Sequence, residues 1–405
     1  MLQKIGVKDL LVGMFVVDTG LSWLEHPYLY SKEGAVRTRG ALREIQAAGY
    51  TEVFIDTERS RPVGGGPGWE SDAEASLAEL LARGPALRVT PAVPLAEGLE
   101  AARTVYKDCL CIARDMLSDV KAGAAVDIEA PKRLVDEVIA SAARNPDALI
   151  ALSKLRCHDA YTFTHGVNVA VLAVAFGASL GIGAGGLCQL GLAGLFHDLG
   201  KTGVPDAILN KPGRLSPEEF DRVKVHPQLG RELLENRGLP EAVLRGVAEH
   251  HEKWGGTGYP KGLAGEDVHA WGRIIGVADV FDALTSRRAY KEGMLPTRAL
   301  AVLYSMRERD FPPGLVERFI KFLGPYPVGS FVRLVGGDHA FVRGSNPARP
   351  LSPELLVAFD KDMCPLPQRV LPAERDGKGP GAIAEALDPA AHGIDPLRYL
   401  CPSAG

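Results

Sequence analysis

The sequence of 405 residues has little that marks a specialised class of protein. Lys and Arg number 46 against 50 Asp and Glu, and the net charge of −4 argues against a protein that coats nucleic acid or an anionic membrane. The six cysteines are scattered without zinc-finger spacing, so we expect reduced thiols in the cytoplasm. Apolar residues, in contrast, make up 46% of the chain, which is enough to bury a sizeable core.

A signal peptide and a membrane span are also missing from the pattern. The first 16 residues carry two lysines and an aspartate, which the apolar core of a signal peptide excludes. Residues 166–196 carry no charge, but five glycines between 177 and 186 divide them. The first part, 167–180, is too short to cross a bilayer. We therefore predict two core helices here and no membrane span.

Helical and strand-like patterns predict a mainly α protein with a smaller part at each end. Two strand-like runs, at 14–17 and 53–55, flank a helical stretch near 38–48 and predict a small N-terminal α/β domain. Nearly every segment from 147 to 323 has helical periodicity, and alternating runs beyond 325 predict a short β-rich C-terminal appendage. The predicted parts are a regulatory or interaction module at 1–60, a Pro/Gly-rich linker with a short helix at 61–97, the helical domain at 98–323, the appendage at 324–372 and a loose tail at 373–405.

The stretch LCQLGLAGLFHDLGKTGVP, at 187–205, is the most informative part of the sequence. An apolar helix ends there in His197 and Asp198, with Gly200 as the expected helix stop and Lys201 beyond it. Burying these polar groups without partners is costly, and a divalent metal ion is a partner for both the imidazole and the carboxylate. The alternative is a capped His–Asp pair at a helix end that binds nothing.

Further histidines and one aspartate occupy helical positions beside apolar residues. His226 falls in a helix that we expect to begin at the Ser216 capping box, and Asp279 lies near the buried face of a later helix. A single buried histidine is usually a satisfied core residue, but several inward imidazoles and carboxylates in a helical bundle are how a bundle builds a metal centre. Seven ligands exceed what one ion needs, so we predict two metals. The seven are His165, His197, Asp198, His226, His250, His251 and Asp279.

Four segments, in order, carry a resemblance to a known family. They are HDLGKTGVPDAILNKPGRLSPEEF, HPQLG, HHEKWGGTGYPKGL and RIIGVADVFDALTSRRAY. Together they resemble the HD-GYP family of bacterial cyclic di-GMP phosphodiesterases over about 151–293. The first sixty residues resemble a poorly characterised domain often fused ahead of such catalytic domains. The resemblance implies a helical HD-type, metal-dependent phosphohydrolase domain.

The resemblance also implies roles for individual residues. The same seven residues would bind two divalent cations, iron or manganese, with zinc or nickel as alternatives. Asp198 and Lys201 would be catalytic, with Lys201 beside the metals and on the phosphate, and Arg288 and Lys291 would grip the substrate phosphates. Tyr259 of the signature Gly-Tyr-Pro loop would also contact substrate, although glycine for an unusual backbone angle and proline for the next could equally make a simple turn.

The chain departs from the family pattern at four positions. Tyr161 stands four residues before His165, where some members have a glutamate that binds a third metal, so we predict a two-metal site. Gly255 replaces the usual aspartate after the tryptophan of the signature loop. Arg287 and Ala289 replace the usual aspartate and proline of the substrate segment. None of these positions is one of the seven predicted ligands.

The expected reaction is hydrolysis of cyclic di-GMP to linear pGpG, with GMP as a further product. Expected partners are cyclic di-GMP, diguanylate cyclase domains at the Gly-Tyr-Pro loop and a second copy of the chain, but no nucleic acid polymer. Two alternatives remain open: a catalytically weak cyclic-dinucleotide sensor that docks a partner, and a hydrolase of another cyclic dinucleotide such as cyclic GMP-AMP.

Overall fold

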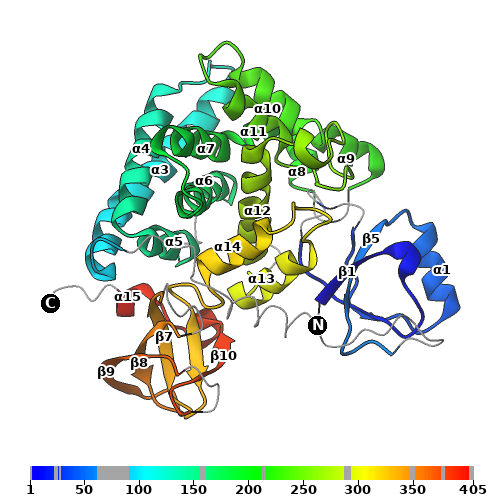
Figure 1. The fold of residues 1–405 in the computed structure, drawn as a ribbon. Coiled ribbons are helices and arrows are strands. Elements are labelled where there is room, and N and C mark those ends of the chain that lie inside the picture. Colours follow the sequence, from blue (N-terminus) through cyan, green and yellow to red (C-terminus); the bar gives the residue numbers. More distant parts are fainter. Residues whose placement is uncertain are drawn as a thin grey trace.

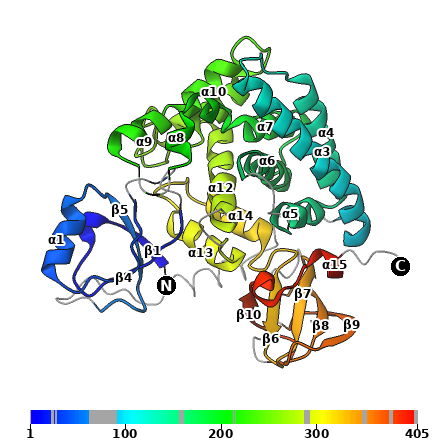
Figure 2. The same cartoon turned by 180° about the vertical axis from the view of Figure 1, so that it is seen from behind.

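The structure is a computed structural model with three parts: a helical body, an N-terminal module and a C-terminal sheet (Figure 1). The module and the sheet lie on separate sides of the body, as the view from behind also shows (Figure 2). The structure describes residues 2–21, 26, 29–61, 91–155, 161–211, 213, 215–286, 293–346, 352–374 and 379–400.

The N-terminal module is the predicted α/β domain. Its strands are β1 (Leu2–Gly6), β2 (Phe15–Val16), β3 (Leu29–Tyr30), β4 (Gly34–Ala35) and β5 (Glu52–Asp56), with the 3-10 helix η1 (Val7–Asp9) and helix α1 (Arg39–Ala47). The sheet has the order β1-β5-β2-β4, and β3 pairs with β5 in parallel. Thr38 caps α1 by accepting a hydrogen bond from the amide of Ala41. A small core that includes Ile45 and Val53 joins helix and sheet.

The helical body begins at Leu95, three residues before the predicted start, because Pro94 precedes the first turn of α3. The short helix that we predict in the linker lies outside the described residues. The elements of the body are α3 (Leu95–Lys121), α4 (Glu129–Arg144), α5 (Pro146–Leu155), α6 (Tyr161–Ser179), α7 (Ala184–Phe196), η2 (Leu199–Gly203), α8 (Asp206–Leu209), α9 (Pro217–Val223), α10 (His226–Leu234), α11 (Glu241–Glu249), η3 (Gly265–Asp267), α12 (Ala270–Thr285), α13 (Pro296–Ser305) and α14 (Leu315–Leu323).

Helices α6, α7 and α12 lie at the centre of the body (Figure 1). The uncharged stretch forms the two predicted helices, α6 and α7, and the chain turns between them at Gly181, whose φ is +81°. Gly194 lets them pack closely, because a Cβ there would lie 3.0 Å from the Ala170 Cα. Among the described helices, none is both long and apolar enough to span a bilayer.

The C-terminal sheet contains β6 (Phe331–Leu334), β7 (His339–Gly344), β8 (Glu354–Phe359), β9 (Pro365–Pro372) and β10 (Ile383–Leu387), all antiparallel in the order β10-β6-β7-β8-β9. It is followed by the 3-10 helix η4 (Pro389–His392) and by α15 (Leu397–Leu400). The Ser345 hydroxyl donates to the Asp147 carboxylate over 2.7 Å and so ties the sheet to α5.

Our prediction of a loose tail at 373–405 is wrong for its described residues. Strand β10 pairs with β6, and the Tyr399 ring stacks on Phe341 with centroids 4.8 Å apart. The composition misled us because the Pro and Gly residues lie in turns, whereas the few apolar residues among them reach the core. Leu400, at 4% exposure, is one of these.

The buried end of the tail gives a stability prediction. Leu400→Ala removes a buried side chain and should lower the free energy of unfolding of the C-terminal sheet by about 2–4 kcal/mol. Hydrogen exchange of the β7 amides measures this loss. Arg398→Ala, at an exposed position of the same helix, is the control and should leave exchange unchanged. Equal exchange in the two variants would mean that the tail adds no stability.

Candidate metal centre

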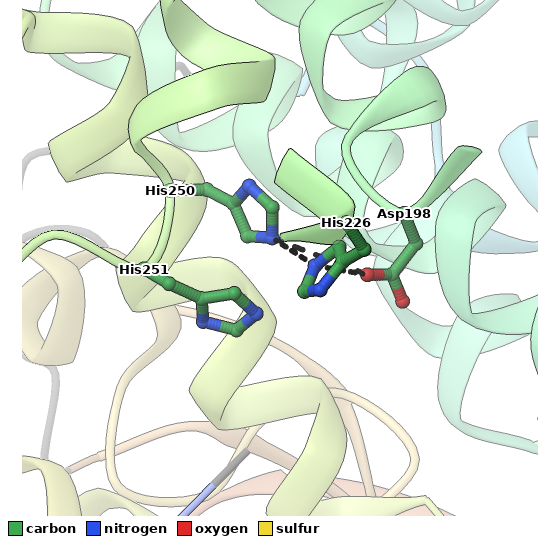
Figure 3. Close-up of side chains that lie close together, drawn as sticks. All are labelled: Asp198, His226, His250 and His251. Atoms are coloured by element: carbon green, nitrogen blue, oxygen red, sulfur yellow. Dashed lines mark hydrogen bonds and ion pairs between the residues drawn. The ribbon is translucent and has the colours of Figure 1, made fainter. Parts of the chain in front are cut away.

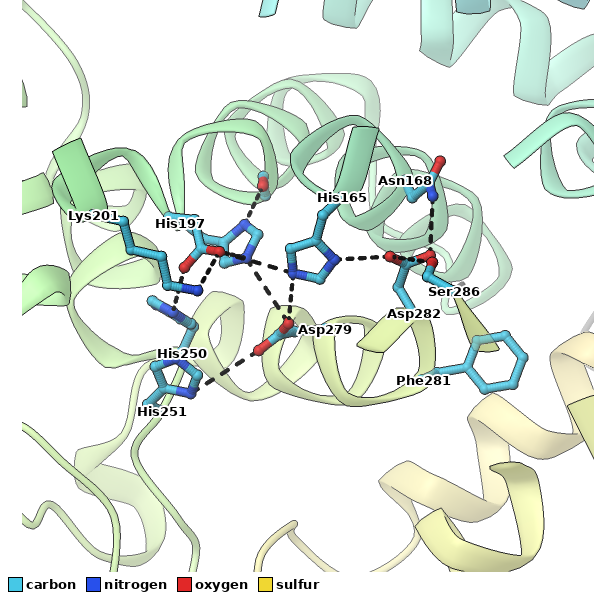
Figure 4. Close-up of polar contacts among 12 residues, drawn as sticks. His165, Asn168, His197, Lys201, His250, His251, Asp279, Phe281, Asp282 and Ser286 are labelled. Atoms are coloured by element: carbon cyan, nitrogen blue, oxygen red, sulfur yellow. Dashed lines mark hydrogen bonds and ion pairs between the residues drawn. The ribbon is translucent and has the colours of Figure 1, made fainter. Parts of the chain in front are cut away.

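All seven predicted ligand residues meet inside the helical body. They form two groups, and within each group one ligand atom per residue lies within 4.8 Å of the others. Figure 3 shows the first group, and Figure 4 shows the second group with His250 and His251 beside it. The first group is Asp198, His226, His250 and His251, and the second is His165, His197 and Asp279.

Five helices supply these side chains, mostly from their ends. His197 and Asp198 directly follow α7, and His250 and His251 directly follow α11. His226 is the first residue of α10, whereas His165 and Asp279 lie within α6 and α12. A helix end suits a polar ligand because the helix can bury its apolar side while its last residues turn toward the centre.

His226 does not lie in the helix opened by Ser216, contrary to our expectation. The capping box is present, with the Ser216 hydroxyl accepting from the Glu219 amide and the Glu219 carboxylate accepting from the Ser216 amide. However, α9 ends at Val223, and a new helix begins at His226 with a proline in its first turn. Pro227 has no amide to donate, so it favours a new helix start over the interior of a longer helix.

Gly200 is also not the helix stop that we predicted. It lies inside η2, and its φ is not positive. A Cβ at this position would lie 2.0 Å from the His226 carbonyl oxygen and 2.4 Å from the Gly230 amide nitrogen. Gly200 therefore permits the close contact between η2 and α10 that brings Asp198 next to His226.

Three of the imidazoles are oriented by the same local hydrogen bond. In each, Nδ1 donates to the backbone carbonyl three residues earlier, which can only accept, so Nδ1 carries the proton and the other nitrogen, Nε2, points into the centre. The pairs are His197 with Gly194 at 2.7 Å, His226 with Val223 at 2.8 Å and His250 with Val247 at 2.7 Å.

Several buried polar atoms of the centre fit a cation. The Nε2 atoms of His197 and His251 are buried and have no hydrogen-bond partner among the described residues. Burial lowers the pKa of His250 and of His251 well below the usual value, and the neighbouring imidazoles lower it further. Neutral imidazole nitrogens and carboxylate oxygens that face one another are the ligands that a divalent transition metal prefers.

The Asp198 carboxylate faces both groups. Its Oδ1 lies 3.3 Å from Nε2 of His226, and its Oδ2 lies 3.6 Å from Nε2 of His197. The Lys201 Nζ donates to Oδ2 over 2.6 Å. Burial by itself would raise the pKa of Asp198, but the ammonium group of Lys201 holds that pKa well below its usual range. Asp198 is therefore an ionised carboxylate between two clusters of imidazoles.

The sequence interpretation missed Asp282, which orients His165. The Asp282 Oδ2 accepts from Nδ1 of His165 over 2.8 Å, and Oδ1 accepts from the Asn168 amide over 3.1 Å (Figure 4). Tyr106 of α3 donates in turn to Asn168 over 2.7 Å. Burial opposes charge on His165, but hydrogen bonds to Asp279 and Asp282 raise its pKa to about 10. The spacing of three residues from Asp279 on one helix could have indicated Asp282.

The Gly-Tyr-Pro loop lies against the centre. The Tyr259 ring stacks near His251, with centroids 4.6 Å apart. Gly258 does not have the unusual backbone angle that we expected, and the loop's positive φ values are at Gly256 and Gly262. A Cβ at Gly258 would instead lie 2.5 Å from the His251 carbonyl oxygen, so this glycine permits a close backbone contact.

The predicted substrate-binding pair, Arg288 and Lys291, lies outside the described residues, as do Arg287 and Ala289. Gly255 is described: its amide donates to the Arg309 carbonyl over 2.9 Å. A Cβ at Gly255 would lie 3.0 Å from that oxygen. Glycine at this position, where the family usually has aspartate, therefore permits a tight backbone contact.

The packing at Gly200 gives a prediction. Gly200→Ala should separate η2 from α10 and weaken the binding of divalent metal by at least about tenfold, because Asp198 and His226 then move apart. Titration of the metal-free protein with Mn²⁺ measures the affinity. Gly203→Ala is the matched control, since its Cβ meets only the flexible end of Leu229 at 3.1 Å. Unchanged affinity in Gly200→Ala would show that this contact does not position the centre.

Two family models match the chain. The model of the HD domain matches residues 139–315, and the model of a domain of unknown function, DUF3391, matches residues 2–131. The second match continues past the N-terminal module into α3 and α4, well beyond the sixty residues for which we noted a resemblance.

Curated relatives and a solved structure resemble the chain as well. A cyclic di-GMP phosphodiesterase of Pseudomonas aeruginosa is 36% identical over 380 residues, which cover 93% of this chain and 90% of the relative. A 3'3'-cGAMP-specific phosphodiesterase of Vibrio cholerae is 41% identical over 127 residues, 31% of this chain and 24% of the relative. The solved structure of an HDG"Y"P protein from Bdellovibrio bacteriovorus covers 80% of this chain and 98% of its own, at 19% identity and a TM-score of 0.46.

The Pseudomonas relative matches nearly the whole of both chains, and the match includes the four motif segments and the module ahead of them. The chain therefore belongs to the HD-GYP family of HD-domain proteins.

Proposed function

We propose that this chain is a metal-dependent phosphodiesterase that hydrolyses cyclic di-GMP to linear pGpG, with GMP as a further product. The observation that carries the proposal is the pair of ligand groups with the Asp198 carboxylate facing both. The names of the relatives support a cyclic dinucleotide as the substrate.

The seven clustered residues would hold two divalent cations, one in each group, with Asp198 between them. When bound, such a pair of cations supplies positive charge to the phosphate and lowers the pKa of water toward neutrality. The donors are imidazoles and carboxylates without thiolate, which favours iron or manganese, with zinc or nickel as alternatives.

The residues of the chain have separate tasks in the proposed reaction. Water attacks the phosphorus in line with the ribose 3′ oxygen, the P–O3′ bond breaks, and the 3′ oxygen takes up a proton. Lys201, whose side chain is 13% exposed, contacts Asp198 and can place its ammonium beside the phosphate. Asp282 keeps His165 in position for its cation. Tyr259, Arg288 and Lys291 are the proposed substrate contacts.

Location and partners are further parts of the proposal. The four cysteines among the described residues are unpaired, which fits the reducing cytoplasm. A diguanylate cyclase domain at the Gly-Tyr-Pro loop and a second copy of the chain stay predictions.

A second candidate substrate is cyclic GMP-AMP. A cGAMP-specific relative is 41% identical over 127 residues, close to the 44% over 133 residues of a cyclic di-GMP phosphodiesterase response regulator from Xanthomonas campestris, so similarity over the catalytic segment fits either substrate. A sensor without catalysis is less well supported, because a sensor needs no complete ligand set, whereas this chain gathers all seven residues into two groups with ligand atoms within 4.8 Å of one another in each.

A turnover assay tests the function. With Mn²⁺ or Fe²⁺ added under anaerobic conditions, the chain should convert cyclic di-GMP to pGpG, and Asp198→Ala should lose both metal and turnover because the shared carboxylate is gone. Circular dichroism should show the helical content unchanged. Asp206→Ala is the matched control, since its carboxylate is exposed and its one ion pair among the described residues is with Lys121 on the surface. Binding of substrate without product in the wild-type chain would favour the sensor, and faster turnover of cyclic GMP-AMP would favour the second substrate.

Lys201 should behave differently from Asp198. Lys201→Met keeps the aliphatic stem but removes the ammonium, so it should retain metal and lose about 10²–10³-fold in kcat. Metal content by elemental analysis and steady-state kinetics separate the two effects. Full activity of Lys201→Met would remove the ammonium from the mechanism.

A further inference from the structure

The N-terminal module touches the helical body through a cluster of buried charges. Lys4 of β1 has a side chain that is only 1% exposed, and its Nζ lies 2.5 Å from Asp310 and 3.0 Å from Glu52. Lys253 lies 3.4 Å from Glu52 and 3.9 Å from Asp310. Two ammonium groups and two carboxylates therefore meet at the boundary, and an Arg309 guanidinium nitrogen lies 3.4 Å from Glu52 at their edge. We call Lys4, Glu52, Lys253 and Asp310 the boundary cluster.

The strand pairing explains how the module presents its half of the cluster. Lys4 is opposite Phe54 in the antiparallel pair of β1 and β5, and Glu52 lies two residues from Phe54. Because alternate residues of a strand face the same side, Lys4, Glu52 and Phe54 share one face. Phe54 is fully buried and belongs to the same apolar core as the helical body. This face of the module is therefore built to contact the body.

In the other half of the cluster, Lys253 belongs to the loop that follows the predicted ligand His251, and Asp310 belongs to the segment between α13 and α14. Lys253 follows His251 by two residues, and the next two amides, of Trp254 and Gly255, donate to the carbonyls of Asp310 and Arg309 at 3.0 and 2.9 Å. The side chain of Lys253 and the two amides after it thus hold the segment that follows His251 against the segment at 309–310. His251, where the first segment begins, is a predicted metal ligand.

The loop from His251 to Leu263 is held together by hydrogen bonds between its own residues. The Tyr259 amide donates to the His251 carbonyl over 3.1 Å. The Glu252 carboxylate accepts from the amides of Lys261 and Leu263 at 2.7 and 2.9 Å. A displacement of Lys253 is therefore passed on to His251 and Tyr259.

We propose that the N-terminal module is a positioning part of the phosphodiesterase site, in which Lys4 and Glu52 fix the His251–Leu263 loop through Asp310 and Lys253. The inference rests on the proposed function. It assigns a role to the domain of unknown function matched at residues 2–131. Buried ion pairs stabilise folds only weakly but fix geometry, which suits this role. Burial raises the pKa of Glu52, but Lys4 and Lys253 lower it to about 2, so its charge persists at neutral pH.

The test is the full chain with Lys4→Met and Glu52→Gln combined. This variant removes one charge of each sign from the module and leaves the Lys253–Asp310 pair in the body. Because His251 belongs to only one ligand group, the affinity for one of two Mn²⁺ ions should fall by roughly tenfold or more, with a matching loss in kcat, while the other Mn²⁺ binds as before. Mn²⁺ titration of the metal-free protein and steady-state kinetics give both values.

The matched control is Glu33→Gln, which removes an exposed ion pair of the same module, with Arg59 at 3.4 Å, and keeps the pair of Arg59 with Asp56. It should bind and turn over as the wild type does. Glu52→Gln alone, which keeps the Lys4–Asp310 pair, is the second variant if the double variant does not fold, and it should show the same pattern more weakly.

Wild-type Mn²⁺ affinities and kcat in both cluster variants would overturn the inference and leave the proposed function intact. Equal weakening of both Mn²⁺ ions would also overturn it, because a general loss of structure predicts that pattern. A wild-type chain that binds no Mn²⁺ and has no turnover would overturn the proposed function and the inference with it.

Discussion

The Asp198 carboxylate between two groups of buried imidazoles is the interaction on which the rest of this site depends. An ionised carboxylate in a helical core is expensive unless it is paired, and Lys201 pairs with only one of its oxygens. Burial keeps His250 and His251 neutral, and His197, His226 and His250 direct their Nε2 atoms inward. Such an arrangement is consistent with the binding of divalent metal.

The helical body serves this centre by bringing helix ends together. Glycines at the closest contacts, of which Gly200 and Gly258 are the tightest near the ligands, let backbone meet backbone where any side chain would separate the ligands. Outside the ligands, Asp282 extends the site to α3 through Asn168 and Tyr106. The boundary cluster extends it in another direction, to the N-terminal module.

Sequence reasoning selected seven residues that cluster in the structure, because several inward histidines and aspartates at helical positions favour one shared site over separate places in the core. It predicted the α/β module, the helices and the C-terminal strands from periodicity and turn residues, and the structure agrees. It gave the wrong reasons for Gly200 and Gly258, because the need for glycine there comes from segments that are distant along the chain. It also treated the Pro- and Gly-rich tail as loose, although Leu400 and Tyr399 anchor it.

Contacts between residues that are far apart in the chain could not be predicted from the sequence. Lys4 and Asp310 are 306 residues apart in sequence, and nothing in either local segment indicates the other. Asp282 was within reach, since it follows Asp279 by one helical turn, but an orienting carboxylate has no motif of its own.

The most direct test of the central claim is crystallography of the Mn²⁺-loaded chain with anomalous scattering. Two anomalous peaks are predicted, one among Asp198, His226, His250 and His251 and one among His165, His197 and Asp279, with the Asp198 carboxylate contacting both. A single peak, or peaks away from these side chains, would contradict the two-metal centre.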